Sequence, residues 1–339
     1  MDAIQQISPA VKFHLYTTVP QWFFADSLVQ DWTYHDCVTD IGMVQKTALR
    51  EDIDATLAQL ARFIPFPAGH ITSLVDELNA LSVNLILCDI SPLGLQVADQ
   101  AGIPSVLIEN FTWDWIYSGY PDAADRFLPF VDYLRDRFAL ADVHIRAAPY
   151  CGETRADLLG APVSRRSRGK RGEMRNRLGI APGQQAVLIT MGGIADRWGF
   201  SAVSRRYPRT VFVIPAGAGR ELPVANILYL PHHHSYFHPD LVAACDAVIG
   251  KVGYSTIAET YWAGIPFGYI SRQGFRESAE LTKFVRATMP GLEISQEEFE
   301  RGEWPERIGD LLQLQPVQHA GQNGADQIAE YLAGRGFIA

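Results

Sequence analysis

The sequence predicts an α/β protein made of two domains, each with a parallel sheet flanked by helices. Three observations lead to this prediction. At 339 residues the chain is too long for one ordinary hydrophobic core and suits two domains of roughly 150 residues. Short apolar runs rich in β-branched residues alternate with helical stretches, which is the order of a parallel sheet with right-handed crossovers. Two of these runs end directly in glycine turns, at residues 191–195 and 250–253.

We expect the first domain to span residues 1–150. Its elements are expected in this order: a helix end at 3–7, a strand at 11–18, helices at 49–63 and 71–81, a strand at 85–89, a helix at 93–100 and a strand at 105–108. A doubly wound domain normally starts with a strand and a glycine-rich turn before its first helix. Neither is visible here, so we expect this domain to lack that strand and loop, through loss or a misplaced start codon.

Residues 151–185 are rich in arginine, glycine and proline, and we expect a linker with one short helix at 172–178. Its basic cluster indicates a solvated face, with a patch for phosphate or anionic lipid as the alternative. The cluster consists of Arg165, Arg166, Arg168, Lys170 and Arg171.

The second domain is expected over residues 186–319, followed by a terminal helix within 320–339. Its strands are expected at 186–190, 211–215, 227–230, 246–249 and 267–270. Ser295 with Glu298 three residues later indicates a capping box.

One stretch of the second domain reads strand, glycine turn, helix. Gly250 and Gly253 have no Cβ to keep a ligand away from the backbone, and Ser255 and Thr256 stand where the first free N–H groups of the helix point outward. Such a corner suits a phosphate. Glu259 is one helical turn further on, on the same helix face as the turn, and can accept hydrogen bonds from the vicinal hydroxyls of a ribose. The alternative is that these glycines only cap and turn an αβ unit.

Polar residues also follow strands elsewhere in the sequence. In the second domain, the strand at 267–270 is followed by Arg272, Arg276 and Glu277. In the first domain, the strand at 85–89 ends in Asp89, and the strand at 105–108 is followed by Asn110. Open α/β sheets bind ligands at the carboxyl ends of their strands, so these groups are expected at the ligand edge.

Asp114 lies within the aromatic run NFTWDWIY. Aromatic rings beside one carboxylate can stack on a sugar face and bind its hydroxyls. A helix that packs its two tryptophans into the core is an equally good interpretation, and both remain open.

Four histidines occur between residues 232 and 238. Consecutive residues of an extended loop point in different directions, and no second ligand group accompanies them, so we expect no metal site. Hydrogen bonds from His232 and His233 to a nucleotide base or phosphate are the preferred interpretation.

Together these motifs resemble the nucleotide-sugar signature of GT-B glycosyltransferases, in particular glycosyltransferase family 28, which includes the bacterial enzyme that adds N-acetylglucosamine to peptidoglycan precursors. The matching positions are Gly250, Gly253, Ser255, Thr256, Glu259, Gly264, Pro266 and Glu277. The resemblance implies two Rossmann-like domains facing each other across a cleft, with a UDP-sugar or another nucleotide diphosphate sugar on the second.

The same resemblance implies roles for single residues. Gly192 and Gly193 would contact the pyrophosphate together with Lys251, and Glu277 would hold sugar hydroxyls. Helix dipoles and amides would stabilise the leaving diphosphate, so no metal or other cofactor is expected. The general base would be Asp89 or Asp114, and the terminal helix would cross back to the first domain.

Nearly the whole chain also resembles the amino-terminal, glycosyltransferase-like half of plant L-arabinokinase and its stand-alone bacterial relatives. The likeness is carried by the runs CDISPLGLQVADQAGIPSVLIENFTWDWIY and PHHHSYFHPDLVAACDAVIGKVGYSTIAE. The sugar-kinase half is missing, so phosphorylation of arabinose is not expected. An active glycosyltransferase with an unknown acceptor, a silent nucleotide-sugar-binding module and a GT-B-like epimerase or hydrolase all remain possible.

Composition excludes other classes of protein. A net charge of −9 argues against a nucleic-acid-binding protein. No apolar run approaches the length of a membrane helix, and no signal peptide or dinucleotide-binding fingerprint is present. The four scattered cysteines are expected to be reduced, so a cytoplasmic location is predicted. The sequence does not predict an oligomeric state.

Overall fold

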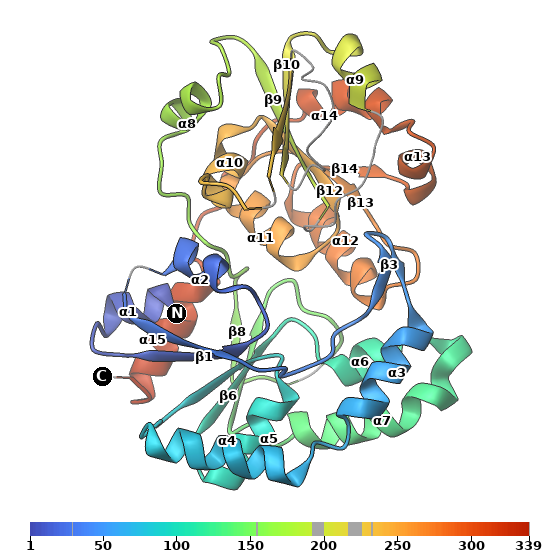
Figure 1. The fold of residues 1–339 in the computed structure, drawn as a ribbon. Coiled ribbons are helices and arrows are strands. Elements are labelled where there is room, and N and C mark those ends of the chain that lie inside the picture. Colours follow the sequence, from blue (N-terminus) through green and yellow to red (C-terminus); the bar gives the residue numbers. More distant parts are fainter. Residues whose placement is uncertain (29, 154, 192–199, 216–225, 232, 339) are drawn as a thin grey trace.

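The computed structural model describes residues 1–28, 30–153, 155–191, 200–215, 226–231 and 233–338. These residues form two α/β domains, drawn one above the other in Figure 1. Helices α1 (Asp2–Ile7) and α15 (Gly324–Gly334), from opposite ends of the chain, lie side by side on the first domain. The predicted fold class, two α/β domains with parallel sheets, is confirmed.

The second domain contains a six-stranded parallel sheet with the strand order β11-β10-β9-β12-β13-β14. Its strands are β9 (Gln185–Thr190), β10 (Thr210–Pro215), β11 (Ile227–Leu230), β12 (Ala247–Lys251), β13 (Phe267–Ile270) and β14 (Gly291–Ile294). Ala247, Val248 and Ile249 are fully buried. Such continuous apolar runs are typical of parallel strands that helices cover on both faces.

Helices cover both faces of this sheet. On one face, side chains of Met174, Leu241, Ile257 and Leu281 belong to one apolar cluster; they come from α8 (Arg171–Arg177), α10 (His238–Ala244), α11 (Tyr254–Ala263) and α12 (Arg276–Thr288). The other face packs against α9 (Phe200–Arg206), α13 (Gln296–Glu300), η2 (Trp304–Arg307) and α14 (Ile308–Gln313). The predicted capping box at Ser295 begins α13 and is confirmed.

The first domain has its parallel strands in two groups. The four-stranded sheet has the order β5-β6-β7-β8, and β1 pairs with β2 separately. These strands are β1 (Phe13–Thr17), β2 (Trp32–Asp36), β5 (Ile86–Asp89), β6 (Ser105–Glu109), β7 (Val143–Ala147) and β8 (Leu158–Gly160). The helices are α2 (Gln21–Ser27), α3 (Ile53–Phe63), α4 (Ala68–Ala80), α5 (Pro92–Ala101), α6 (Trp113–Tyr117), η1 (Pro121–Ala123) and α7 (Ala124–Phe138).

The single helix expected over 49–63 is wrong at its start. Residues 45–51 form a hairpin of β3 (Gln45–Thr47) and β4 (Arg50–Glu51). The Asp52 side chain accepts a hydrogen bond from the Ala55 amide at 3.0 Å and so caps α3 at Ile53. Ala48 and Leu49 at the hairpin tip are buried in an apolar cluster of the second domain. The hairpin therefore anchors one domain to the other, as Figure 1 shows for β3.

The basic cluster of residues 165–171 is not simply a solvated face. Arg168 donates to the backbone carbonyls of Asp26 and Ser27 at 2.9 and 2.6 Å. Arg171 donates to the carbonyl of Cys245 at 2.6 Å, and Arg165 binds a buried carboxylate of the second domain. The solvated-face interpretation is wrong for Arg165, which is partly buried against that carboxylate. Arg168 and Arg171 are exposed as expected, and each also bridges separate segments of the chain.

The chain passes between the domains twice, at residues 161–170 and again before α15. The two passages are bonded to each other: the Gly324 amide donates to the Pro162 carbonyl at 3.2 Å, and the Asn323 side chain donates to the Ser164 carbonyl at 2.9 Å. A Cβ on Gly324 would lie 2.0 Å from the Ala161 carbonyl oxygen, so the close approach requires glycine.

Candidate active site between the domains

The amino end of α11 lies at the carboxyl end of β12, in the centre of the second sheet. Gly253 occupies the N-cap position and no side chain caps the helix, so its first amides remain available to an anion. Space around Gly253 is open, with the nearest atom, the Lys251 carbonyl oxygen, 4.0 Å from where a Cβ would stand. Ser255 is exposed and Thr256 half-buried.

Gly250 has a different role from the one expected. A Cβ there would lie only 2.4 Å from the Thr190 carbonyl oxygen of the neighbouring strand β9. The residue is also buried. Glycine is therefore required at this position for strand packing, and only Gly253 leaves room for a ligand to approach the backbone.

Charged groups from both domains meet beside this turn. The Arg272 guanidinium donates to Glu51 Oε1 at 3.3 Å and lies 3.8 Å from Glu277 Oε2. Asn110 of the first domain donates its amide to Glu277 Oε1 at 3.0 Å. Burial raises the pKa of Glu277, and burial together with the neighbouring Arg272 lowers the pKa of Lys251 to about 8. The arrangement leaves Lys251 as a half-buried cation beside the uncapped helix end.

Asp89 approaches this region from the first domain. It ends β5, and its neighbour Ile90 has a positive φ of 56°, which is rare for a β-branched residue. The Asp89 side chain is open to solvent although surrounding protein atoms raise its pKa. Burial, and after it the charge of Asp89, raises the pKa of Tyr254 at the start of α11. The charge of Asp89 therefore acts on the first residue of α11.

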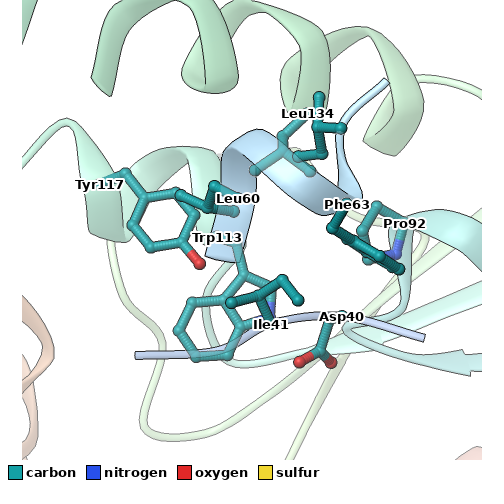
Figure 2. A pocket seen from close by; sticks show the side chains of 9 residues that line it. Asp40, Ile41, Leu60, Phe63, Pro92, Trp113, Tyr117 and Leu134 are labelled. Atoms are coloured by element: carbon teal, nitrogen blue, oxygen red, sulfur yellow. The ribbon is translucent and has the colours of Figure 1, made fainter. Parts of the chain in front are cut away.

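Asp40 is a second carboxylate near Asp89. Burial and the charge of Asp89 raise the pKa of Asp40 to about 6. Figure 2 shows Asp40 beside Trp113 at the edge of a cavity of about 10 Å³, the size of a single water. Asp40 was not predicted from the sequence, because the strand β2 before it shows no apolar run that would mark a strand end.

No family model matches the chain. Over 324 residues it is 28% identical to L-arabinokinase of Arabidopsis thaliana, a match that covers 94% of this chain and 31% of that protein. The chain therefore spans about a third of the length of this relative. Among solved structures, a UDP-glucosyltransferase of Polygonum tinctorium matches with a TM-score of 0.60 and 14% identity, over 96% of this chain and 86% of the other.

MurG of Acinetobacter baumannii matches with a TM-score of 0.54 and 13% identity, over 95% of this chain and 99% of the other. Spinosyn forosaminyltransferase matches with a TM-score of 0.59 and 13% identity, over 98% of this chain and 88% of the other. The chain has the GT-B fold. At these identities the likeness establishes the fold and not the reaction.

Within this GT-B fold, Glu259 is already engaged by the protein. It is 6% exposed, Oε1 accepts from Arg165 at 2.9 Å, and Oε2 lies 2.7 Å from Nδ1 of His238. Burial alone would raise the pKa of Glu259, but His238 and Arg165 outweigh it and hold the pKa below its usual value. A cavity of about 270 Å³ lies beside Arg165, Glu259 and Trp262. A ribose hydroxyl that bound Glu259 would have to share a carboxylate oxygen with Arg165 or His238.

Arg276 and His233 bind the first domain. Arg276 donates to the Trp115 carbonyl at 2.6 Å and lies over the Trp115 ring at 4.1 Å, while the His233 ring stacks on Trp22 at 4.8 Å. Both therefore hold the domains together in this GT-B arrangement. Gly192, Gly193 and His232 lie outside the described residues, so their predicted ligand contacts stay predictions.

Asp114 lies apart from these groups. Its Oδ2 is 4.0 Å from Nε of Arg135 on α7, within the first domain. Trp113 stacks near Tyr117, with ring centroids 5.8 Å apart, as the core interpretation of the aromatic run predicts. Within the part of the chain that the structure describes, no hydrogen bond or ion pair links Asp114 to the second domain, so nothing in this geometry supports its predicted catalytic role.

The residues that the structure describes contain no cluster of three or more histidines, cysteines or carboxylates arranged to hold a metal. No helix among them is both long and apolar enough to span a bilayer.

Proposed function

We propose that the protein binds a nucleotide diphosphate sugar, most simply a UDP-sugar, between its two domains and transfers the glycosyl group to an acceptor hydroxyl. The observation that carries the proposal is the uncapped amino end of α11, with Lys251 beside it and with Asp89 of the first domain near enough for its charge to raise the pKa of Tyr254. The GT-B fold and the names of its structural neighbours support the same class of reaction.

The second domain would bind the diphosphate. The amides after Gly253, the hydroxyls of Ser255 and Thr256, and the ammonium of Lys251 would donate to its oxygens. The same donors would stabilise the charge that develops on the leaving diphosphate as its bond to the sugar breaks, so the scheme needs no metal. Glu277 would accept from sugar hydroxyls with the oxygen that Arg272 holds loosely at 3.8 Å.

Asp89 would act as the general base. It would take the proton of the acceptor hydroxyl while the acceptor oxygen forms its bond to the sugar. The bond between the sugar and the diphosphate breaks at the same time, and the diphosphate leaves with the electron pair of that bond. A raised pKa makes a carboxylate a stronger proton acceptor at neutral pH, which suits the role. The four cysteines are unpaired, in keeping with the cytoplasm as the compartment that we propose.

Thermal shift against UDP, GDP, ADP and TDP tests binding, because a ligand that binds only the native state raises its melting temperature. Turnover is then followed as nucleotide release from UDP-sugars with and without acceptors. We expect Asp89→Asn to lower turnover by about 10²–10⁴-fold with UDP binding intact, and Asp114→Asn, the matched control, to retain it. No shift with any nucleotide, or full turnover by Asp89→Asn, would refute the proposal.

A catalytically silent nucleotide-sugar-binding module is the second candidate. The specific observation in its favour is that Glu259 has both carboxylate oxygens bound by protein side chains. Binding without turnover would support this module. Release of free sugar or of an epimer without any acceptor would instead indicate a hydrolase or epimerase.

A further inference from the structure

Glu277 is a buried carboxylate whose two oxygens have different surroundings. It lies in the first turn of α12 and is 4% exposed. Oε1 accepts a hydrogen bond from the Asn110 amide at 3.0 Å, whereas Oε2 is 3.8 Å from a guanidinium nitrogen of Arg272. A separation of 3.8 Å is too long for a hydrogen bond. Oε2 therefore keeps its capacity to accept one.

Asn110 is fixed in place by its own domain. It follows β6 directly and is almost fully buried. Its backbone carbonyl accepts from the Cys151 amide at 2.8 Å, and its side-chain nitrogen lies 3.9 Å from the Cys151 sulfur. The amide that holds Glu277 is thus anchored in the first domain, while the carboxylate belongs to the second. The bond between them exists only while the two domains are docked.

The first domain also determines which carboxylate Arg272 binds. Its guanidinium donates to Glu51 Oε1 at 3.3 Å and lies over the Phe275 ring at 3.6 Å. Glu51 ends the β3–β4 hairpin, whose Leu49 is buried in the second domain. A buried guanidinium needs a carboxylate partner, and Glu277 is the other carboxylate beside Arg272. If Glu51 were absent, a movement of roughly 1 Å would bring Arg272 within hydrogen-bonding distance of Oε2.

Two donors in this region have no protein partner in the described part of the chain. They are Nε of Arg272 and the hydroxyl of Tyr120, both buried atoms. Burial raises the pKa of Tyr120, and after burial the charges of Glu51 and Arg272 act on it in opposite directions, so the hydroxyl lies near both. Buried donors are nearly always hydrogen-bonded, so free ones call for a polar ligand or water. A sugar hydroxyl can accept from such a donor while it donates to Glu277.

We propose that Asn110 and Glu51 are positioning residues for recognition of the donor sugar. Asn110 fixes Oε1 of Glu277, and Glu51 holds Arg272 away from Oε2, so that Oε2 accepts a hydrogen bond from a sugar hydroxyl. Both positioning residues belong to the first domain, so Glu277 binds the sugar only while the domains are docked. This inference rests on the proposed function, because it assigns the sugar specificity of the same site.

The test compares sugar binding with nucleotide binding in the 339-residue chain. Titration calorimetry gives the dissociation constants of UDP, UDP-glucose and UDP-N-acetylglucosamine. The constant for UDP divided by that of the tighter-bound UDP-sugar measures what the sugar adds to affinity. We expect Asn110→Ala and Glu51→Gln each to lower this ratio about tenfold, with UDP affinity unchanged within about twofold.

A control and a second variant separate positioning from folding. Glu300 pairs with Arg50 of the same hairpin at 3.0 Å but is 38% exposed and does not contact Arg272, so Glu300→Gln should keep the ratio. If Asn110→Ala does not fold, Asn110→Asp takes its place. It would put a second carboxylate beside Glu277, so the ratio should fall at neutral pH and recover near about pH 5, where the two groups share a proton.

The possible outcomes are distinct. An unchanged ratio in either positioning variant, with a UDP-sugar bound, would overturn the inference and leave the proposed function standing. An equal fall of the ratio in Glu300→Gln would assign the effect to hairpin docking in general and would also overturn it. A wild-type protein that binds none of the three nucleotides would refute the proposed function, and this inference with it.

Discussion

Replacing Arg165 by alanine tests whether Glu259 is a structural group. Glu259 is a buried carboxylate, and Arg165 is itself only 27% exposed. Removing one partner of a buried ion pair costs about 3–5 kcal/mol because the remaining charge is left uncompensated. His238 stays bonded and Arg165 is partly solvated, so we expect a loss of about 2 kcal/mol in the free energy of unfolding at pH 7. Urea unfolding measures it.

The neighbouring Arg166 provides the matched control. It pairs with Asp326 and is 57% exposed, so Arg166→Ala should lose less than about 1 kcal/mol. The pKa of Glu259 lies below its usual value, so the stabilisation is present above the unfolded-state pKa and is lost as the pH falls through the folded one. The difference between wild type and Arg165→Ala should therefore shrink below about pH 4. Equal stability of the two alanine variants at pH 7 would refute the reasoning.

Two further predictions concern the α11 turn. Burial, with Arg272 nearby, lowers the pKa of Lys251 to about 8, so calorimetric UDP affinity should fall about tenfold as the pH rises through that value. Lys251→Met should remove the pH dependence of UDP affinity. A wild-type affinity that does not change with pH would contradict the prediction. Gly250→Ala should lose about 2–3 kcal/mol in urea unfolding, because its Cβ would lie 2.4 Å from a backbone oxygen. A Cβ at Gly309 would have no atom within 4 Å, so Gly309→Ala should leave the free energy of unfolding unchanged or slightly higher. Equal losses of stability in the two variants would contradict this prediction.

The buried strands were predictable from the sequence alone. β11 and β13 have the predicted bounds, because a run of only four apolar residues bounded by turn residues is too short for a helix and favours a buried strand. β2 was missed, since its five residues WTYHD are only partly buried and show no apolar run. The β3–β4 hairpin was missed for another reason. Leu49 is apolar because it docks into the second domain, and its apolar character extended a helical pattern that does not begin until Ile53.

Only the part of the candidate site that one continuous segment of the second domain forms was predictable from the sequence. The strand, turn and helix around Gly253 are local in sequence, and the structure places them together as expected. The partners of the predicted residues are not local: Asn110 reaches Glu277 from 167 positions away, and Arg165 reaches Glu259 from 94. Such contacts depend on how the domains dock, and no periodicity or motif encodes that. Arg165 was accordingly interpreted as solvated although it neutralises a buried charge.

The paired passages at residues 161–164 and 323–324 also determine how the molecule can be divided. Because α15 completes the first domain, that domain is built from two separate pieces of the sequence, whereas the second domain is one continuous piece. Proteolytic cleavage at one passage would leave the fragments covalently joined through the other, so separating them would take two cuts. Truncation ahead of α15 would also strip a helix from the first domain and uncover Val106 and Ile145. An isolated second domain can be expressed as one segment, whereas an isolated first domain needs its last helix supplied by fusion or in trans.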